Sequence, residues 1–145
     1  MGEIKVHTGY IELSTKGSID IINITQNLEK ELINSGIYDG ILTVFVPGAT
    51  GAVATIECEE GLIIDTKEMF LELIKENKNY HHNKSHAQGN ATSHLRATLI
   101  GPSLTIPITD GKLQRGIWQE VVFIEFDNRP RKRQLIVKIL GTTKK

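Results

Sequence analysis

The stretch GILTVFV at residues 40–46 constrains the fold of this chain more than any other. It is a nearly unbroken run of apolar, largely β-branched residues, and Pro47-Gly48 follows it with a turn signal. Such a run is typical of a central strand that is covered on both faces. A chain that contains it must supply neighbouring strands and a second layer to cover them.

Several other segments carry strand patterns. Residues 4–15 alternate apolar and polar side chains, as expected of a half-buried strand. Asp110-Gly111 is a hairpin signal between two of the later segments. We therefore expect further strands over residues 4–15, 51–58, 104–108, 117–126 and 134–140.

Two segments have the features of helices. Apolar residues recur every four positions between residues 23 and 36, and Gly36 can take the left-handed conformation that ends a helix. These apolar positions are Ile24, Leu28 and Leu32. A second helix is expected to begin at Asp65, because Asp65 and Glu68 have the spacing of a capping box. Two main helices among more numerous strands predict an α+β fold, a mixed sheet or sandwich, in a single domain over residues 1–145.

The charge balance and the cysteine content limit the possible partners and compartments. Seventeen basic residues balance seventeen acidic ones, so the chain has no general attraction for nucleic acid or for an anionic membrane surface. Cys58 is the one cysteine, which excludes an intrachain disulfide and favours a reducing compartment. The first residues lack the apolar stretch of a signal peptide. We expect a cytoplasmic protein without nucleic-acid or membrane partners.

Four of the five histidines fall within residues 80–94, YHHNKSHAQGNATSH. The rest of this segment is too polar for a core element, so burial does not explain them. The alternatives are a metal site, a proton-transfer site and a solvated, histidine-rich loop. Among these residues, His82, His94 and His86 are the candidate metal ligands, since three imidazoles and a water form an open, catalytic type of zinc site. Gly89 and two asparagines, Asn83 and Asn90, argue against a regular helix in this segment.

Carboxylates and arginines offer further candidates. Glu57 follows a predicted strand, where it can act as a general base or orient a ligand histidine. The alternative is a solvated charge within a short acidic cluster. The basic run at residues 129–133 is typical of a solvated hairpin turn, or else it holds an anionic group of a substrate.

Several motifs stand out from residue 93 onward: SHLRATLIGPSLTIP at residues 93–107, GIWQ at 116–119 and FDNRPR at 126–131, with Tyr80-x-His82 upstream. In these motifs the sequence resembles the YjbQ-like family, also called the secondary thiamine-phosphate synthase family. It implies a compact α+β fold that assembles as a homotrimer. It also implies a divalent metal, for which imidazole ligands favour zinc, at a centre to which His82 and His94 contribute.

The resemblance also implies roles for two acids and an activity. The family's glutamate corresponds to Glu57 and its later aspartate to Asp65. The assigned family activity is weak thiamine-phosphate synthesis, which releases pyrophosphate, and Arg96 is our candidate for holding the anion. Diphosphates are usually handled by magnesium on carboxylates rather than by zinc on imidazoles. This mismatch points to a different native activity.

The chain departs from the family pattern near the histidines. His86 stands where relatives tend to carry tryptophan, and Thr92 stands where a histidine is frequent. Our leading hypothesis is a metal-dependent enzyme acting on a small, phosphorylated molecule. The alternative is a non-catalytic trimer that binds a small metabolite through its histidines.

Overall fold

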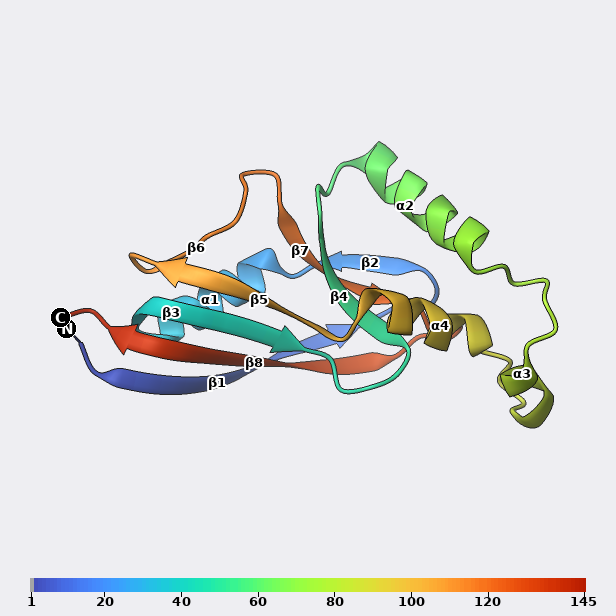
Figure 1. The fold of residues 1–145 in the computed structure, drawn as a ribbon, viewed down its shortest axis with the longest axis horizontal. Coiled ribbons are helices and arrows are strands. Elements are labelled where there is room, and N and C mark those ends of the chain that lie inside the picture. Colours follow the sequence, from blue (N-terminus) through green and yellow to red (C-terminus); the bar gives the residue numbers. More distant parts are fainter. Residues whose placement is uncertain (1) are drawn as a thin grey trace.

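The computed structural model describes residues 2–145, which form eight strands and four helices (Figure 1). The strands are β1 (Ile4–Ser14), β2 (Asp20–Asn23), β3 (Ile37–Phe45), β4 (Gly51–Ile56), β5 (Ser103–Thr109), β6 (Lys112–Leu113), β7 (Glu120–Glu125) and β8 (Lys132–Thr143). The helices are α1 (Thr25–Ser35), α2 (Glu60–Leu73), α3 (His81–Ser85) and α4 (Ala91–Ile100). The predicted α+β class in a single domain is confirmed.

The strands form two antiparallel sheets. The larger has the order β1-β8-β3-β5-β6, and the smaller has the order β2-β7-β4. The predicted position of β3 inside a sheet is confirmed, since it pairs with both β8 and β5. The expectation that both its faces are covered is wrong for the single chain. Leu42 and Val44 are fully buried, whereas Ile41 and Phe45 on the opposite face are 45% and 41% exposed.

Helix α1 forms where the four-residue spacing predicts it. Ile24, Leu28 and Leu32 are buried and pack into the main core together with the inward-facing residues of the larger sheet. Gly36 ends the helix with φ at 70°, a left-handed conformation in which glycine carries no side-chain penalty. Burial of this apolar stripe fixes α1 against the sheet.

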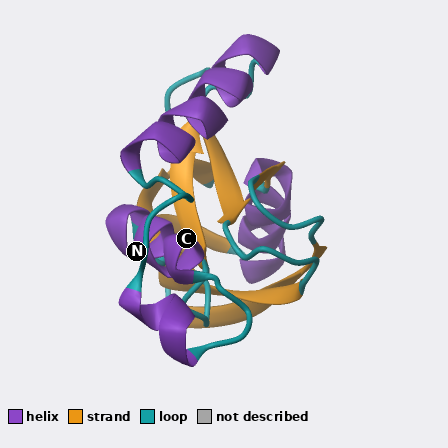
Figure 2. Ribbon diagram, turned by 90° about the vertical axis from the view of Figure 1, so that its right-hand side faces the viewer, coloured by secondary structure: helices purple, strands orange, loops and turns teal. Residues whose placement is uncertain are grey.

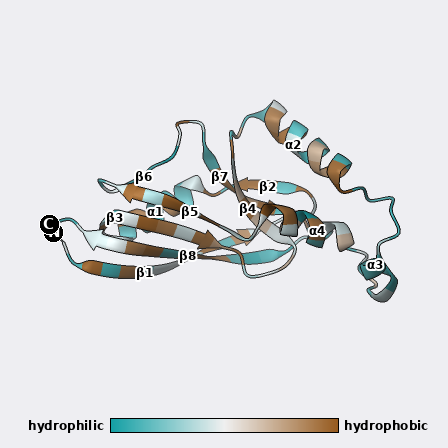
Figure 3. Cartoon of the chain, viewed as in Figure 1, coloured by the Kyte–Doolittle hydropathy of each residue, from teal (hydrophilic) through white to brown (hydrophobic). Residues whose placement is uncertain are grey.

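The smaller sheet lies between two apolar clusters. Figure 2 shows the strands with helices on both sides of them. Alternate residues of β7 point to opposite sides, so Val121 and Phe123 join the main core while Val122 and Ile124 join a second cluster. The second cluster also contains Phe70 of α2 and Ala97 of α4, together with Ala52 and Phe126. Burial on both sides explains the unbroken apolar run from Val121 to Ile124 in β7. Figure 3 shows further hydrophobic stretches along β3 and β5.

Helix α2 begins at Glu60, five residues before the predicted start. The carboxylate of Glu59 accepts hydrogen bonds from the backbone N–H groups of Gly61 and Leu62, so Glu59 is the N-cap. Asp65 lies inside the helix and caps nothing. The predicted start was wrong because Glu59, in the acidic cluster next to Glu57, also offers a cap, and its carboxylate is the one that reaches free N–H groups.

Helices α3 and α4 were not expected. Asn83 lies inside α3, whereas Gly89 lies between the two helices and Asn90 is the N-cap of α4, so the five-residue α3 is the helix that contains one of these residues. Both helices lie at the end of the molecule opposite the two termini (Figure 1). Within residues 2–145, no helix combines the length and the apolar character needed to cross a bilayer.

Candidate functional site

The histidine-rich segment brings three imidazole rings together. The ring centroids of His82 and His86 are 4.2 Å apart with the planes at 14°, a stacked pair. The centroids of His82 and His94 are 4.8 Å apart with the planes at 69°, an edge-to-face pair. His82 and His86 come from α3 and the residue after it, and His94 comes from the first turns of α4. His82 and His94 are partly exposed and His86 is exposed, so a small molecule can reach the cluster.

The geometry of these rings suits two metal ligands better than three. Imidazole lone pairs lie in the ring plane, so the stacked rings of His82 and His86 direct their nitrogens side by side rather than toward one point. The steep angle between His82 and His94 allows their nitrogens to converge. In the described part of the chain, no three side chains of the His, Cys, Asp and Glu types are grouped to hold one metal ion. His86, the predicted third ligand, therefore does not share one binding point with His82 and His94. The metal itself stays a prediction.

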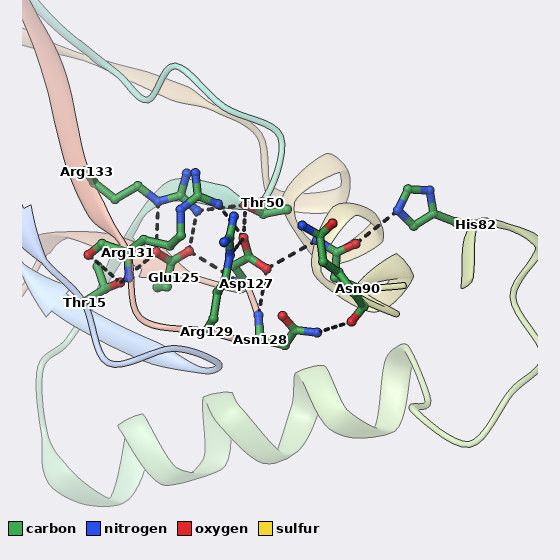
Figure 4. A network of polar contacts seen from close by, with 11 residues as sticks. Thr15, Thr50, His82, Asn90, Glu125, Asp127, Asn128, Arg129, Arg131 and Arg133 are labelled. Atoms are coloured by element: carbon green, nitrogen blue, oxygen red, sulfur yellow. Dashed lines mark hydrogen bonds and ion pairs between the residues drawn. The ribbon is translucent and has the colours of Figure 1, made fainter. Parts of the chain in front are cut away.

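Asn90 connects the imidazoles to a buried carboxylate. Its Oδ1 lies 3.1 Å from Nε2 of His82, and its Nδ2 donates to Oδ1 of Asp127 over 3.3 Å. Both Asn90 and Asp127 are buried, at 7% and 2% exposure. His82 is thus the outer end of a polar chain that runs into the protein (Figure 4).

Asp127 is held in its ionised form. Burial alone would raise the pKa of its carboxyl group. Hydrogen bonds from Arg131, from the Asn128 backbone and from Asn90, together with the charge of Arg131, outweigh that effect and leave the pKa below its ordinary value. The hydroxyl of Thr50 also donates to this carboxylate, over 3.3 Å. At neutral pH, Asp127 is an anion that can only accept hydrogen bonds.

A second buried carboxylate anchors the inner end of the same network. Glu125 is fully buried and accepts hydrogen bonds from two guanidinium nitrogens of Arg133, one of them the Nε at 2.9 Å. The hydroxyl of Thr15 donates to it over 2.8 Å, and the backbone N–H of Asp127 donates over 3.3 Å. Arg133 also donates to the Thr50 hydroxyl, which joins this group to Asp127 (Figure 4).

These contacts correct the interpretation of residues 129–133 as a solvated turn. Arg133 is buried at 4% exposure, and Arg131 forms an ion pair with Asp127. Arg129 fits the original description better, since its side chain is 56% exposed and its Nε lies 3.9 Å from Asp127. The basic run therefore neutralises two buried acids, and Arg129 is the arginine of this network that a dissolved anion can reach most easily.

The structure does not bring Glu57 to the imidazoles within one chain. Thr50, which contacts Asp127, precedes β4, and Glu57 follows the far end of that strand. Six extended residues span about 20 Å. Glu57 instead lines an open pocket of about 390 Å³ together with Cys58 and Trp118. Within one chain, Glu57 and the imidazoles therefore lie at opposite ends of β4.

Arg96 has a structural position rather than the predicted anion-binding one. Its side chain is fully buried, pairs with Glu76 at 2.9 Å and donates to the carbonyl of Ile74 at 2.8 Å. Thr92 donates to the same Glu76 carboxylate. Arg96 therefore ties α4 to the segment that follows α2, and a substrate anion cannot reach its guanidinium.

Sequence reasoning missed most of the residues that support His82. Asn90 was grouped with the loop asparagines, and Asp127, Thr50 and Glu125 were not singled out. One usable signal was present, because an aspartate and a glutamate at residues 125–127 face a basic run at 129–133 across a predicted turn. Opposite charges near such a turn are placed to pair across the hairpin.

Comparisons with known proteins agree with this architecture. The family model described as "UPF0047 protein YjbQ-like" matches residues 9–142. A UPF0047 protein of Archaeoglobus fulgidus is 38% identical over 130 residues, covering 90% of this chain and 98% of that protein. A UPF0047 protein of Methanothermobacter thermautotrophicus is 36% identical over 138 residues, covering 95% and 94%.

Two solved structures have the same fold. The crystal structure of a YbjQ-like protein of unknown function from Sulfolobus solfataricus matches with a TM-score of 0.91 and 34% identity, over 96% of this chain and 99% of that one. The crystal structure of a hypothetical protein from Aeropyrum pernix matches with a TM-score of 0.86 and 36% identity, over 93% and 98%.

Proposed function

The chain belongs to the YjbQ-like UPF0047 family, and from that premise we propose that it is a metal-dependent enzyme whose centre is the imidazole cluster. The observation that carries the proposal is the approach of His82 and His94, twelve positions apart in sequence, to a ring separation of 4.8 Å. Both rings are accessible from solvent, and a buried polar network supports one of them. Polar, supported and accessible imidazoles are the usual components of a catalytic metal site.

His82 and His94 are the residues that would hold a zinc-type ion. When bound, such an ion polarises a substrate oxygen or activates a water molecule. His86 lies exposed beside His82, with its Nδ1 at the Ser85 hydroxyl and the His82 carbonyl, so its Nε2 is the nitrogen that would exchange protons with the substrate. An anionic group on a small, phosphorylated substrate meets the exposed Arg129 rather than the buried Arg96.

The proposal is tested by thermal unfolding of protein purified without an affinity tag. A ligand at about 100 times its Kd adds about 2.7 kcal/mol to the free energy of unfolding. For a chain of this length the Tm therefore rises by roughly 5–10 °C with zinc and falls again with a chelator. If the Tm does not change with zinc or chelator but rises with a small metabolite, the result supports the alternative of a non-catalytic binding protein.

We also propose that the chain assembles as a homotrimer, because two apolar surfaces are uncovered in the single chain. The outward face of the larger sheet aligns Val6, Leu140 and Ile41 across three strands, at 61%, 48% and 45% exposure. Helix α2 projects from the body of the molecule and exposes Leu71 and Leu73 (Figure 1). Apolar surfaces of this kind are usually covered by a partner.

The trimer is tested by sedimentation. We expect a particle of three times the 16.2 kDa chain mass. A charge placed on the buried surface should dissociate it, so Leu140→Asp tests the sheet face and Leu73→Asp tests α2. Ile33→Asp is the control, because Ile33 is 77% exposed and lies on α1, outside both surfaces. Sedimentation of the unsubstituted protein at the mass of one chain contradicts the assembly.

A further inference from the structure

Asn90 occupies a helix cap but does not cap the helix. It is the N-cap residue of α4, and its side chain makes no cap hydrogen bond. The backbone N–H of Ala91 is satisfied instead by Oδ1 of Asn83, at 3.0 Å. Asparagine is among the preferred N-cap residues because its side chain can reach the first free N–H groups. At this position the amide is directed to His82 and Asp127 instead.

The two contacts of Asn90 determine how its amide is oriented. An ionised carboxylate only accepts hydrogen bonds, so the Asn90 atom facing Asp127 must be the NH2 group. The atom facing His82 is then the carbonyl oxygen, which only accepts. Nε2 of His82 must therefore carry a hydrogen in order to donate to it.

We infer that Asn90 is a positioning residue that holds neutral His82 in the tautomer with hydrogen on Nε2. The lone pair of the ring is consequently on Nδ1. Asp127 acts through Asn90, because its fixed acceptor character prevents the amide from turning over. The tautomer follows from these contacts alone, whereas the use of Nδ1 as a metal ligand rests on the proposed function.

His82 is supported by more than the single hydrogen bond to Asn90. Arg131, Thr50 and the Asn128 backbone all donate to Asp127, so the carboxylate has few ways to move. Outer partners of a ligand histidine commonly fix its tautomer and ring orientation, and their loss costs about 10–100-fold in metal affinity. Asn90, a neutral amide, and Asp127, a buried anion, are outer partners of His82 in this sense.

The test is nuclear magnetic resonance of the imidazole nitrogens in chelator-treated protein labelled with ¹⁵N-histidine. The spectra are recorded at about pH 8.5, well above the ordinary imidazole pKa, because the two nitrogens of a neutral imidazole can be told apart. In the unsubstituted protein we expect one His82 tautomer, protonated on Nε2 and slow to exchange that proton with water. In Asn90→Leu, which keeps the volume but not the polar atoms, we expect a mixture of both tautomers.

Asn83→Ala is the matched control. Asn83 also spans α3 and α4, but its side chain accepts from the backbone N–H of Ala91 rather than from the His82 ring, so its loss should leave the nitrogen pattern unchanged. Hydrogen on Nδ1 of His82 in the unsubstituted protein overturns the inference without any variant. An equal change in both variants, or no change in Asn90→Leu, also overturns it. If the tautomer pattern is as expected and no zinc binds, the proposed function fails and the inference stands.

Discussion

Glu125→Ala is expected to lower the free energy of unfolding by about 3–5 kcal/mol, because it leaves Arg133 as an unpaired charge in the core. Glu125 and Arg133 are 0% and 4% exposed and are joined through two guanidinium nitrogens. Removing one partner of a buried ion pair costs far more than the pair contributes, since the remaining charge is no longer compensated. Thr15 and the Asp127 backbone N–H also lose an acceptor.

The measurement is urea unfolding of the variant beside two comparisons. Arg129→Ala removes an exposed arginine from the same turn and should change the free energy of unfolding by less than about 0.5 kcal/mol. The double variant Glu125→Leu with Arg133→Met removes both charges and should recover most of the loss. A Glu125→Ala variant as stable as the unsubstituted protein would show that the pair is not buried in solution.

His82→Ala and His94→Ala should each lower the affinity for zinc by more than the roughly 100-fold upper range seen when an outer partner is lost. Each variant removes a proposed ligand itself. His86→Ala should have a much smaller effect, because the stacked ring of His86 cannot direct a nitrogen to the point that His82 faces. Metal competition titrations on tag-free protein measure all three.

His81→Ala is the control for these variants. His81 adjoins His82 on α3 but is exposed, and the interactions found in the cluster join the other three imidazoles. It should bind zinc as the unsubstituted protein does. Equal losses in His81→Ala and His82→Ala would mean that the segment is merely histidine-rich, as one of the sequence alternatives holds.

Local patterns predicted the elements whose causes are local. The spacing of Ile24, Leu28 and Leu32 and the stop at Gly36 determine α1, and residues 40–45 of the apolar run form the second part of β3. The start of α2 was misplaced because two acidic segments offered caps. Glu59 is the one whose carboxylate reaches free N–H groups, and sequence spacing does not distinguish it from Asp65.

The site was predicted only in its histidines, and through family resemblance as much as through composition. Asn90 reaches Asp127 across 37 positions, and Arg96 reaches Glu76 across 20. Such pairings depend on how helices and strands dock, which no local pattern encodes. Arg96 was therefore assigned to a substrate, although its position in the fold gives it a protein partner.

Anomalous diffraction from crystals of tag-free protein, recorded on both sides of the zinc absorption edge, tests the central claim most directly. The account predicts one peak per chain, within bonding distance of His94 and of Nδ1 of His82, with Asn90 still on Nε2. Zinc bound elsewhere on the chain, or imidazoles of His82 and His94 that share no ion in zinc-saturated crystals, would contradict it.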